Sequence, residues 1–477
     1  MAECRRILLW VLTCLGLVLA EEDRSPAVMA RITTKGLEYG LQKGVALLQQ
    51  ELSQTRLPDV TGKVKIIRGL EVQYKFHRLS IHDFQLPKAR ITPLQRVGLL
   101  VSIFDAFAEL RGLWRVDSFL ARASGHLSVE IEGISVFVRP RLGVDSSGKL
   151  TAAISYCITQ VSEIRMKISS RQSSLSVFLK DVTEDVKRAL EEQVCEVVTK
   201  VVELKVHPHL QSLPVRAMID KAIGVDFSLV GPPLTTLNSL DIGLKGEFFS
   251  SSGPAAAPAS PPRLCFPAEQ SRMVYLATSS HFLSQAAEVF YQAGRPKFEI
   301  TSDMIPGDAP VQLNTASFQS FIPQLQKLYP DAPMKLWITP SSAPLVTVDG
   351  GSLRAAAALD IQALAILPDA QEAPLFLLQA SSSVAVRLAV ESGRLVPRVE
   401  LGRIELSLAR SQVGAFNVPL MTAVLNMYAP DILAPRINEG LSEGFPLPIP
   451  GNLQLHNLVI QPLQDCLVFG ADIRYRL

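Results

Sequence analysis

The segment GPPLTTLNSLDIGLKGEFFSSSGPAAAPASPP, residues 231–262, lies near the middle of the 477-residue chain and divides it into two similar halves. Proline fixes φ and lacks a backbone N–H, so the clusters at 232–233 and 254–262 cannot continue a helix or a central strand. Such clusters are typical of a semi-rigid connector. On each side the order is the same: an amphipathic helix, alternating strands, a second long amphipathic helix, and a closing strand after Leu-Pro. The sequence therefore predicts two similar domains, residues 21–230 and 263–477, joined by a spacer at 231–262.

Composition agrees with two domains that bury or carry apolar material. The length exceeds what one core usually covers. Hydrophobic residues make up 48% of the chain and charged residues only 19%, which is apolar for a globular protein. Charge is uneven: residues 21–230 hold 29 Lys and Arg against 24 Asp and Glu, whereas residues 231–477 hold 16 against 20. An anionic partner would therefore be attracted to the first half.

Residues 1–20, MAECRRILLWVLTCLGLVLA, have the pattern of a secretory signal peptide. Arg5 and Arg6 form a basic start, an apolar run follows, and small residues close the segment at Ala20. We expect a secreted, extracellular monomer, and storage in a granule before release stays open. No later run of about 18 apolar residues is present, so no transmembrane segment is expected. Removal of the leader leaves four cysteines, which secretion allows to oxidise.

The first half begins with a helix predicted over residues 27–52, where leucine and valine recur at helical spacing. Gly36, Gly40 and Gly44 recur every fourth residue beside that stripe. Glycine inside a helix costs roughly 1 kcal/mol relative to alanine. The three glycines therefore indicate either close packing on a curved sheet or room for a ligand chain beside the helix.

Strands and a second helix complete the first half. From 62 to 168 apolar residues alternate with polar ones, and no helix intervenes, which predicts a long twisted antiparallel sheet. A second helix is predicted over 174–206. It contains Cys195, and Cys157 lies on a predicted strand. The division into domains favours a disulfide between them, which would stabilise the domain by roughly 2 to 4 kcal/mol.

The second half repeats this plan. Helices are predicted over 282–293 and 318–328, and a last helix over 418–441. Strands are predicted around 345–348, 357–366, 375–390, 396–408 and 466–475. Cys265 and Cys466 remain in this half, and they either form a second disulfide or stay as buried thiols.

Ten segments, in order along the chain, carry a family resemblance: RITTKGLEYGLQKG, LPDVTGKVKI, SIHDFQLP, VEIEGISV, LPVRAMID, LKGEFFS, RMVYLATSSHF, SDMIP, EGFPLPIP and VFGADIRY. The chain resembles the bactericidal/permeability-increasing protein and lipopolysaccharide-binding protein family, which includes the phospholipid and cholesteryl ester transfer proteins. It resembles the bactericidal/permeability-increasing branch most.

This resemblance covers essentially the whole mature chain and has several implications. It implies an α+β fold of two elongated barrels in a boomerang, each a twisted antiparallel sheet with two long helices, joined by a central sheet. It also implies a pocket for phospholipid acyl chains in each barrel, so that bound phospholipid is the expected ligand and no cofactor is needed. The disulfide of Cys157 and Cys195 is implied as well.

Basic residues of the first half are the candidates for binding an anionic lipid. Lipid A carries phosphates beside acyl chains, so a receptor needs Lys or Arg donors next to apolar surface. Between residues 63 and 96 eight basic residues oppose only Glu71 and Asp83, and apolar residues are interleaved with them. The alternative is a set of solvated strand faces. By resemblance, the barrel-tip cations of the family map onto Lys65 and Arg68.

A second stretch, RGLWRVDSFLARASG at 111–125, keeps Trp114 but has acidic and apolar residues where the family has basic ones. Fewer phosphate partners predict weaker or different recognition of anionic lipids. The candidate anionic-lipid residues are Lys63, Lys65, Arg68, Lys75, Arg78, Lys88, Arg90, Arg111, Arg115 and Arg122.

The sequence thus predicts a secreted lipid-binding protein of innate immunity. It would bind lipopolysaccharide at the basic tip of the first barrel, meet the bacterial outer-membrane surface and hold acyl chains in apolar pockets. An extracellular phospholipid carrier without bactericidal activity is the alternative. No catalytic motif is present, so no enzyme is expected. No metal or nucleic-acid partner is expected either: His207 and His209 flank Pro208 in a predicted exposed loop, and the basic cluster is modest.

Overall fold

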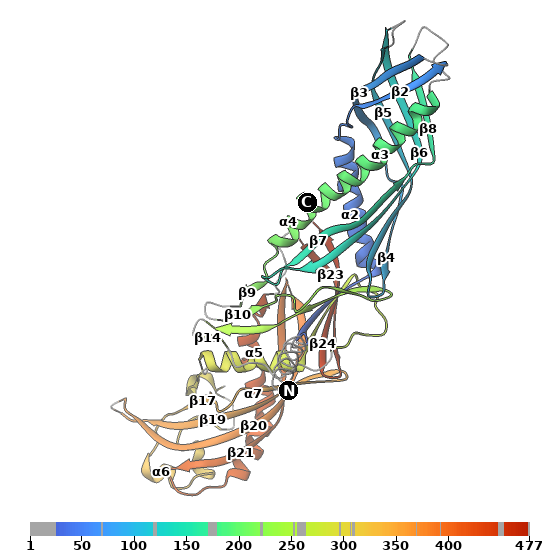
Figure 1. The fold of residues 1–477 in the computed structure, drawn as a ribbon. Coiled ribbons are helices and arrows are strands. Elements are labelled where there is room, and N and C mark those ends of the chain that lie inside the picture. Colours follow the sequence, from blue (N-terminus) through green and yellow to red (C-terminus); the bar gives the residue numbers. More distant parts are fainter. Residues whose placement is uncertain are drawn as a thin grey trace, which may run out of the picture.

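The computed structural model describes residues 25–67, 70–117, 122–169, 179–219, 223–250, 253–254, 264–294, 297–305, 307, 311–368, 370–391, 393–446 and 453–475. These residues form an elongated body with a seven-stranded sheet at each end and a six-stranded sheet between them (Figure 1). The predicted α+β fold with two sheet-rich halves is confirmed. The predicted signal peptide lies outside the described residues.

The sheet of the first half is antiparallel throughout its described pairings, as its alternating pattern predicted. Strands β2, β3, β5, β6 and β7 follow one another across it, while β4 pairs with β5 and β8 pairs with β6. The bounds are β2 Val60–Ile67, β3 Leu70–Gln85, β4 Lys88–Leu94, β5 Gly98–Asp117, β6 Arg122–Val144, β7 Leu150–Gln160 and β8 Glu163–Ile168.

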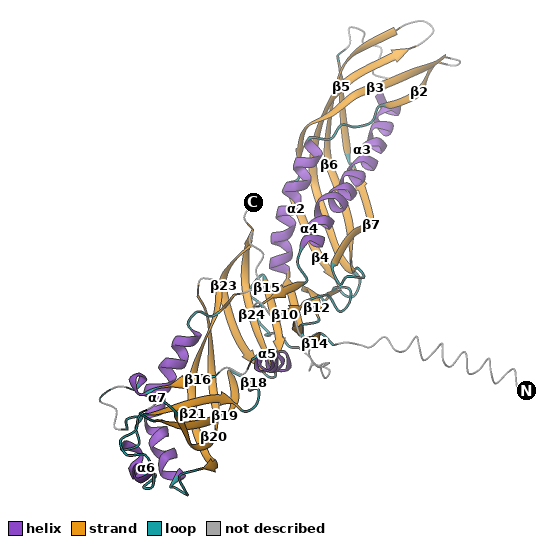
Figure 2. Ribbon diagram, turned by 90° about the vertical axis from the view of Figure 1, so that its left-hand side faces the viewer, coloured by secondary structure: helices purple, strands orange, loops and turns teal. Residues whose placement is uncertain are grey.

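Two long helices, α2 (Thr34–Ser53) and α3 (Leu179–Val201), lie along one face of this sheet (Figure 2). The prediction that the first helix begins at residue 27 is wrong, because Val28–Thr33 forms strand β1. Thr33 has extended backbone and caps the helix, its side-chain oxygen accepting a hydrogen bond from the Gly36 N–H. Periodicity alone missed this boundary.

The inner face of α3 is a stripe of fully buried side chains at helical spacing, formed by Val182, Val186, Leu190 and Val194. The predicted disulfide of Cys157 and Cys195 is present and links β7 to α3, with Cα atoms 5.8 Å apart. Beyond α3 the chain continues as a π-helical turn, Val202–Val206, and then as α4, His207–Ser212. The predicted start of this helix at 174 lies outside the described residues.

The central sheet takes strands from both halves, in the order β11-β12-β1-β15-β24-β23. Its strands are β11 Leu234–Thr235, β12 Ser239–Leu244, β1, β15 Val274–Ser279, β24 Cys466–Tyr475 and β23 Leu453–Leu463. A further four-stranded sheet, β14-β13-β10-β9, consists of Gly253–Pro254, Glu247–Ser250, Ile223–Asp226 and Arg216–Met218.

The interpretation of residues 231–262 as a connector is therefore wrong for residues 234–250, which form β11, β12 and β13. A proline restricts the backbone only at its own position and at the residue before it, so it gives no information about the residues further along. Pro232 and Pro233 precede β11, and Pro254 lies in the edge strand β14, where a missing N–H is tolerated. Between them, Leu240 is buried in the central sheet.

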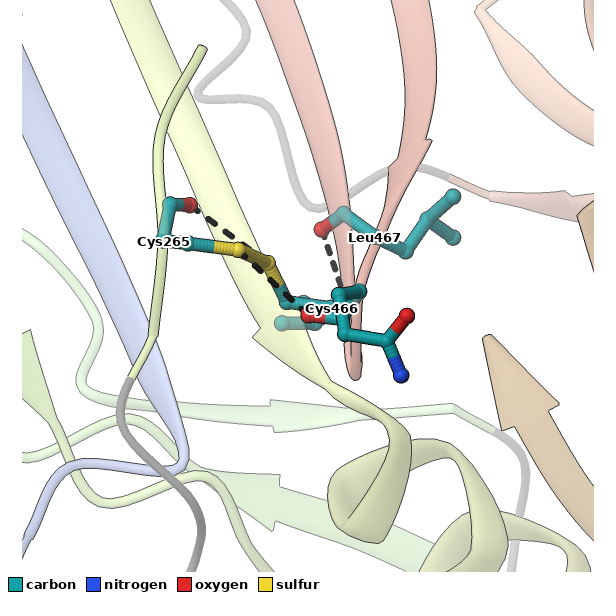
Figure 3. The surroundings of a disulfide bond; sticks show 5 residues. Cys265, Cys466 and Leu467 are labelled. Carbon is teal, nitrogen blue, oxygen red and sulfur yellow. Dashed lines mark hydrogen bonds between the residues drawn. A yellow bond between two sulfur atoms is a disulfide. The ribbon is translucent and has the colours of Figure 1, made fainter. Parts of the chain in front are cut away.

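A charge pair and a disulfide hold the central sheet together. The Arg31 guanidinium donates to both carboxylate oxygens of Asp241, at 2.7 and 2.6 Å, and stacks on the Phe266 ring at 3.9 Å. Cys265 and Cys466 form a disulfide beside Leu467 at the start of β24 (Figure 3). Of the two states expected for these cysteines, the disulfide is the one present.

The described sheet of the second half contains four of the five predicted strands and three more, while the predicted strand at 466–475 belongs to the central sheet. The order of the second-half sheet is β16-β17-β19-β20-β21-β22, with β18 paired to β19. The bounds are β16 Phe298–Ile300, β17 Met334–Pro340, β18 Leu345–Asp349, β19 Ser352–Ile366, β20 Glu372–Glu391, β21 Arg394–Ser411 and β22 Phe445–Pro446.

Helices α5 (Ser280–Ala293) and α7 (Val418–Leu441) agree with the prediction. The helix predicted over 318–328 is wrong: the chain forms a 3₁₀ turn η4, Ser317–Ser320, and one α-helical turn α6, Leu325–Leu328. Pro323 lies between them, and proline disfavours helical backbone at the residue before it. An earlier 3₁₀ turn, η3, spans Ser302–Met304. No helix in the described part of the chain is long and apolar enough to cross a membrane.

Candidate lipid-binding surfaces

Several of the candidate cations lie on β2, β3 and β5. These strands reach the end of the molecule far from the central sheet (Figure 1). Lys75 on β3 is directly opposite Arg115 on β5, and both are exposed. Their neighbours Tyr74, Phe76 and Trp114 point to the other face and are buried. Strand alternation therefore places cations outside and aromatic rings inside at the same level of the barrel. We call this end of the first barrel the tip.

Acidic residues neutralise part of this charge. Lys75 pairs with Asp59 at 2.7 Å, and this hydrogen bond, together with the nearby ammonium charge, lowers the pKa of the Asp59 carboxyl. Asp117 accepts from Arg115 at 2.8 Å and lies 3.4 Å from Arg122. The charges are solvent-exposed, so each pair contributes little to stability and can exchange partners. An anionic group arriving at the tip would compete with these carboxylates.

Three other tip candidates are less fully described. Lys63 is exposed and its main chain pairs with Gln73. The main chain of Lys65 pairs with Glu71 in β2, but its side chain lies outside what the structure describes. Arg68 lies entirely outside the described residues.

Further along the strands, Arg78 and Arg111 lie on the exposed surface between the tip and the central sheet. Arg78 has φ +56°, at an irregularity in the pairing of β3 with β5. Arg111 pairs with Glu109 on its own strand at 2.8 Å. A pair within one strand face is typical of a solvated surface, which was the alternative interpretation of these residues.

Lys88 and Arg90 lie at the other end of the sheet. They are on β4, opposite Phe104 and Ser102 of β5. Arg115 follows Ser102 by 13 positions along β5, a distance of roughly 40 Å along an extended strand. Lys88 also pairs with Asp105 at 2.7 Å, and this hydrogen bond raises the pKa of the Lys88 ammonium. The ten candidates therefore form no single site.

Behind the tip, the inner face of the sheet packs on α2 and α3. The Tyr74 ring lies 5.4 Å from Phe76, and its hydroxyl hydrogen-bonds to Asp185 of α3. Trp114 is 2% exposed, and its indole N–H has no partner among the described residues. The tip is thus a cationic surface on a closed aromatic core.

The glycine stripe of α2 divides into two environments. A Cβ atom at Gly36 would collide with the main-chain oxygen of Met273, so this glycine permits close packing. At Gly40 and Gly44 a Cβ would meet nothing within 4 Å. The close-packing interpretation is therefore wrong for Gly40 and Gly44, which lie on the exposed side of α2.

In the second half, an open hollow of about 720 Å³ lies between β21 and α7. Its lining mixes polar and apolar side chains: Gly402, Arg403, Glu405, Leu406, Pro419, Thr422, Ala423 and Asn426. The Asn426 amide accepts from the Ile404 N–H at 2.7 Å and donates to the Ile404 carbonyl at 2.7 Å. It thereby replaces a neighbouring strand at the exposed edge of β21.

No residues in the described ranges form a metal site of three or more His, Cys, Asp or Glu side chains. His207 and His209 belong to α4, so the predicted loop is wrong. His209 is exposed, as expected. His207 is half-buried, and its Nδ1 accepts from the Ala152 N–H at 3.3 Å.

One surface escaped the sequence analysis: Phe104, Phe137, Tyr156 and Ile158 lie together on the outer face of the first sheet. The register brings them together from three strands. Each residue lies at the outward position of its own alternating strand, which was a usable signal. Their association across strands was not visible, because register depends on bulges at Asp105 and Arg139.

Comparisons with known proteins agree over both halves. A model of the LBP / BPI / CETP family N-terminal domain matches residues 36–207, and a model of the family's C-terminal domain matches residues 217–475. The lipopolysaccharide-binding protein of Mus musculus is 36% identical over 454 residues, covering 94% of each chain. The bactericidal permeability-increasing protein of Sebastes schlegelii is 32% identical over 453 residues, covering 94% of this chain and 96% of that one.

Among solved structures, one of a lipopolysaccharide binding protein shares this fold. A crystal structure of a lipopolysaccharide binding protein superposes with a TM-score of 0.65 at 34% identity, covering 95% of this chain and 100% of that chain. The identities do not favour the bactericidal/permeability-increasing branch over the lipopolysaccharide-binding branch.

Proposed function

This chain belongs to the LBP / BPI / CETP family, and we propose that it is a secreted lipid-binding protein that captures lipopolysaccharide at the tip of its first barrel. Its relatives are named for binding lipopolysaccharide or for increasing bacterial permeability, and the chain is a binding protein rather than an enzyme. Phospholipid acyl chains would be held between the helices and sheets.

The observation that carries the proposal is the cross-strand pair of Lys75 and Arg115 above buried aromatic rings. Two cations opposite one another on neighbouring strands can both reach one phosphate or two adjacent phosphates. Arg donates two parallel hydrogen bonds to a phosphate, which gives direction as well as charge. Asp59 and Asp117 hold these cations in place until a stronger anion replaces them.

Acyl chains need apolar space as well as a phosphate site. The hollow between β21 and α7 supports such space in the second barrel. Bound phospholipid in both barrels is part of the proposal.

The test measures binding of lipopolysaccharide and of phosphatidylcholine vesicles at low and at high salt. We expect Lys75→Ala/Arg115→Ala to weaken lipopolysaccharide binding about tenfold, because each cation near an anionic surface contributes about 1 kcal/mol and its own ion pair offsets part of that. Lys65→Ala/Arg68→Ala should have a similar effect. Salt should weaken wild-type binding, since exposed charges are screened.

Lys200→Ala is the matched control, because Lys200 is an exposed cation paired with Glu196 on α3 and lies outside the tip. Wild-type affinity in both double variants would refute the tip assignment. Uptake of phosphatidylcholine that is insensitive to salt, without preference for lipopolysaccharide, would instead support the neutral phospholipid carrier.

A further inference from the structure

The outer face of the first sheet changes character between its two ends. Toward the tip it carries exposed ion pairs between neighbouring strands or along one strand. Lys167 pairs with Glu130, and Arg165 pairs with Glu163 at 2.9 Å and Glu132 at 3.4 Å. Such alternating charges are typical of a face in contact with water.

Toward the central sheet, the same face is apolar and aromatic. Phe137 on β6 is opposite Ile158 on β7, and the Phe104 ring on β5 meets the Phe137 ring edge-on at 5.6 Å. Tyr156 follows on β7. We call Phe104, Phe137, Tyr156 and Ile158 the outer apolar patch.

The outer apolar patch is open to solvent and faces away from the helices. Phe104 is 37% exposed, Ile158 is 38% exposed and Tyr156 is 46% exposed. Between Tyr156 and Ile158, Cys157 points the other way and is bonded to Cys195 of α3. Side chains of alternating residues point to opposite faces of a strand. No helix among the described residues covers this part of the sheet.

Cations surround the outer apolar patch with little acidic compensation. Arg90 lies in the same cross-strand row as Phe137, and Arg139 places its guanidinium 5.8 Å from the Tyr156 ring. Arg141 follows two residues later on β6. In the described part of the chain none of these three arginines has an ion pair, and Asp105, the one acid on these strand stretches, already pairs with Lys88.

Aromatic rings with cations at their border suit the boundary between a bilayer and water. Aromatic side chains are enriched at the level of lipid headgroups, and each Lys or Arg near an anionic leaflet adds about 1 kcal/mol of attraction. The surface is spread over three strands of a sheet rather than cut as a groove, so it fits a planar partner.

We propose that the outer apolar patch, with Arg90, Arg139 and Arg141, docks the first barrel on the surface of an anionic bilayer. The barrel would lie along the membrane on this face. The inference rests on the proposed lipid function, but it does not depend on the tip. An acidic protein is the other class of partner with this chemistry, and exposed aromatic rings bordered by arginines favour the bilayer.

The experiment measures partition of the full chain onto vesicles of phosphatidylglycerol and phosphatidylcholine, compared with vesicles of phosphatidylcholine alone. Phe104→Ser/Ile158→Ser and Arg90→Gln/Arg139→Gln should each weaken partition onto the anionic vesicles about tenfold. Lys167→Gln, which removes a paired cation from the ion-paired part of the same face, should partition like the wild type. Wild-type partition in both double variants would overturn the proposal.

Lipopolysaccharide dispersed in detergent separates this proposal from the tip. The patch variants should bind dispersed lipopolysaccharide like the wild type, whereas Lys75→Ala/Arg115→Ala should bind it more weakly than the wild type. If the wild type does not bind lipopolysaccharide yet partitions through the patch, the proposed function fails and this inference stands. Patch-dependent binding of polyglutamate without partition onto vesicles would assign the surface to an acidic protein and refute the bilayer.

A third variant tests insertion without removing the patch. Tyr156→Trp keeps an aromatic ring at the exposed position, and we expect brominated phosphatidylglycerol in the vesicles to quench the added fluorescence. The native Trp114 is buried and should be quenched far less. Equal fluorescence on brominated and ordinary anionic vesicles would overturn the proposal even if the double variants failed to fold.

Discussion

The two end barrels share a plan but differ in how their cores are built. The first encloses one continuous core that includes 31 buried apolar residues among those described, contributed by the sheet and by α2 and α3. The second has a main cluster of 13, and a separate small cluster lies beside α7. In the first barrel a disulfide links the sheet to a helix, whereas in the second Asn426 and Asn438 link β21 to α7.

The surfaces of the two barrels also differ. The first barrel exposes the tip cations and the outer apolar patch on its sheet, whereas the second exposes apolar side chains of its helix α7, including Leu420 at 43% and Met427 at 66% exposure. A barrel with a large core and a covalent link can keep charges and ligands on its outside without opening. A barrel held by side-chain hydrogen bonds is better suited to open between helix and sheet. The comparison therefore predicts that helix and sheet separate more easily in the second barrel than in the first.

The largest expected effect comes from the disulfide. Cys157→Ser/Cys195→Ser should lower the free energy of unfolding of the first barrel by roughly 4 kcal/mol, because a cross-link over 38 residues no longer restricts the unfolded chain. Trp114 reports on the first barrel and Trp337 on the second, so denaturant unfolding can follow each with the other tryptophan changed to phenylalanine. The Trp337 transition should move by a few tenths of a kcal/mol at most. A similar shift in both transitions would mean that the barrels unfold together.

A smaller effect is expected at Asn426, whose side chain hydrogen-bonds α7 to β21 in the second barrel. Asn426→Ala leaves the N–H and carbonyl of Ile404 without their partner and should cost about 2 kcal/mol in the Trp337 transition. Hydrogen exchange at the Ile404 amide should become faster, since that N–H loses its acceptor. Leu420→Ala, on the exposed side of α7, is the control and should change stability by less than about 0.5 kcal/mol. An unchanged hydrogen-exchange rate at the Ile404 amide would show that the Asn426 hydrogen bonds do not hold α7 against β21.

The smallest effect compares two glycines of one helix. Gly40→Ala should stabilise the first barrel by about 0.5 to 1 kcal/mol, because alanine is the better helix former and its Cβ meets open space. Gly36→Ala should destabilise it, since the Cβ would collide with the main chain at Met273. The Trp114 transition measures both. A destabilising Gly40→Ala would mean that the space beside α2 is filled, and reduced phospholipid uptake in that variant would identify an acyl chain as the occupant.

Periodicity predicted much of the fold, and its failures are local. The helix over 418–441 and the closing strand over 466–475 were placed with the bounds that the structure has. The start of the first helix was missed because the residues before Thr33 also carry apolar side chains, and only their pairing with two neighbouring strands makes them a strand. The segment at 234–250 was misassigned because proline is visible in a sequence and strand pairing is not.

For the candidate site, residue type was predictable and position was not. Lys75 and Arg115 were chosen as isolated basic residues, and antiparallel register made them neighbours. Lys88 and Arg90 were close to Lys75 in the sequence, and the length of the strands carried them to the other end of the barrel.

The sequence by itself determined the two-part plan, the excess of positive charge in the first half, the alternation of its strands and the cysteine pair 157 and 195. These follow from local chemistry: backbone periodicity decides which side chains share a face, and charge is additive along the chain. Only the tertiary structure decided that residues 28–33 and 239–244 build a sheet between the halves and that Lys75, Arg115 and Arg122 are paired with carboxylates. It also decided that Phe104, Phe137, Tyr156 and Ile158 meet on one face. Each depends on strand register, which contacts between distant residues set and a single bulge changes.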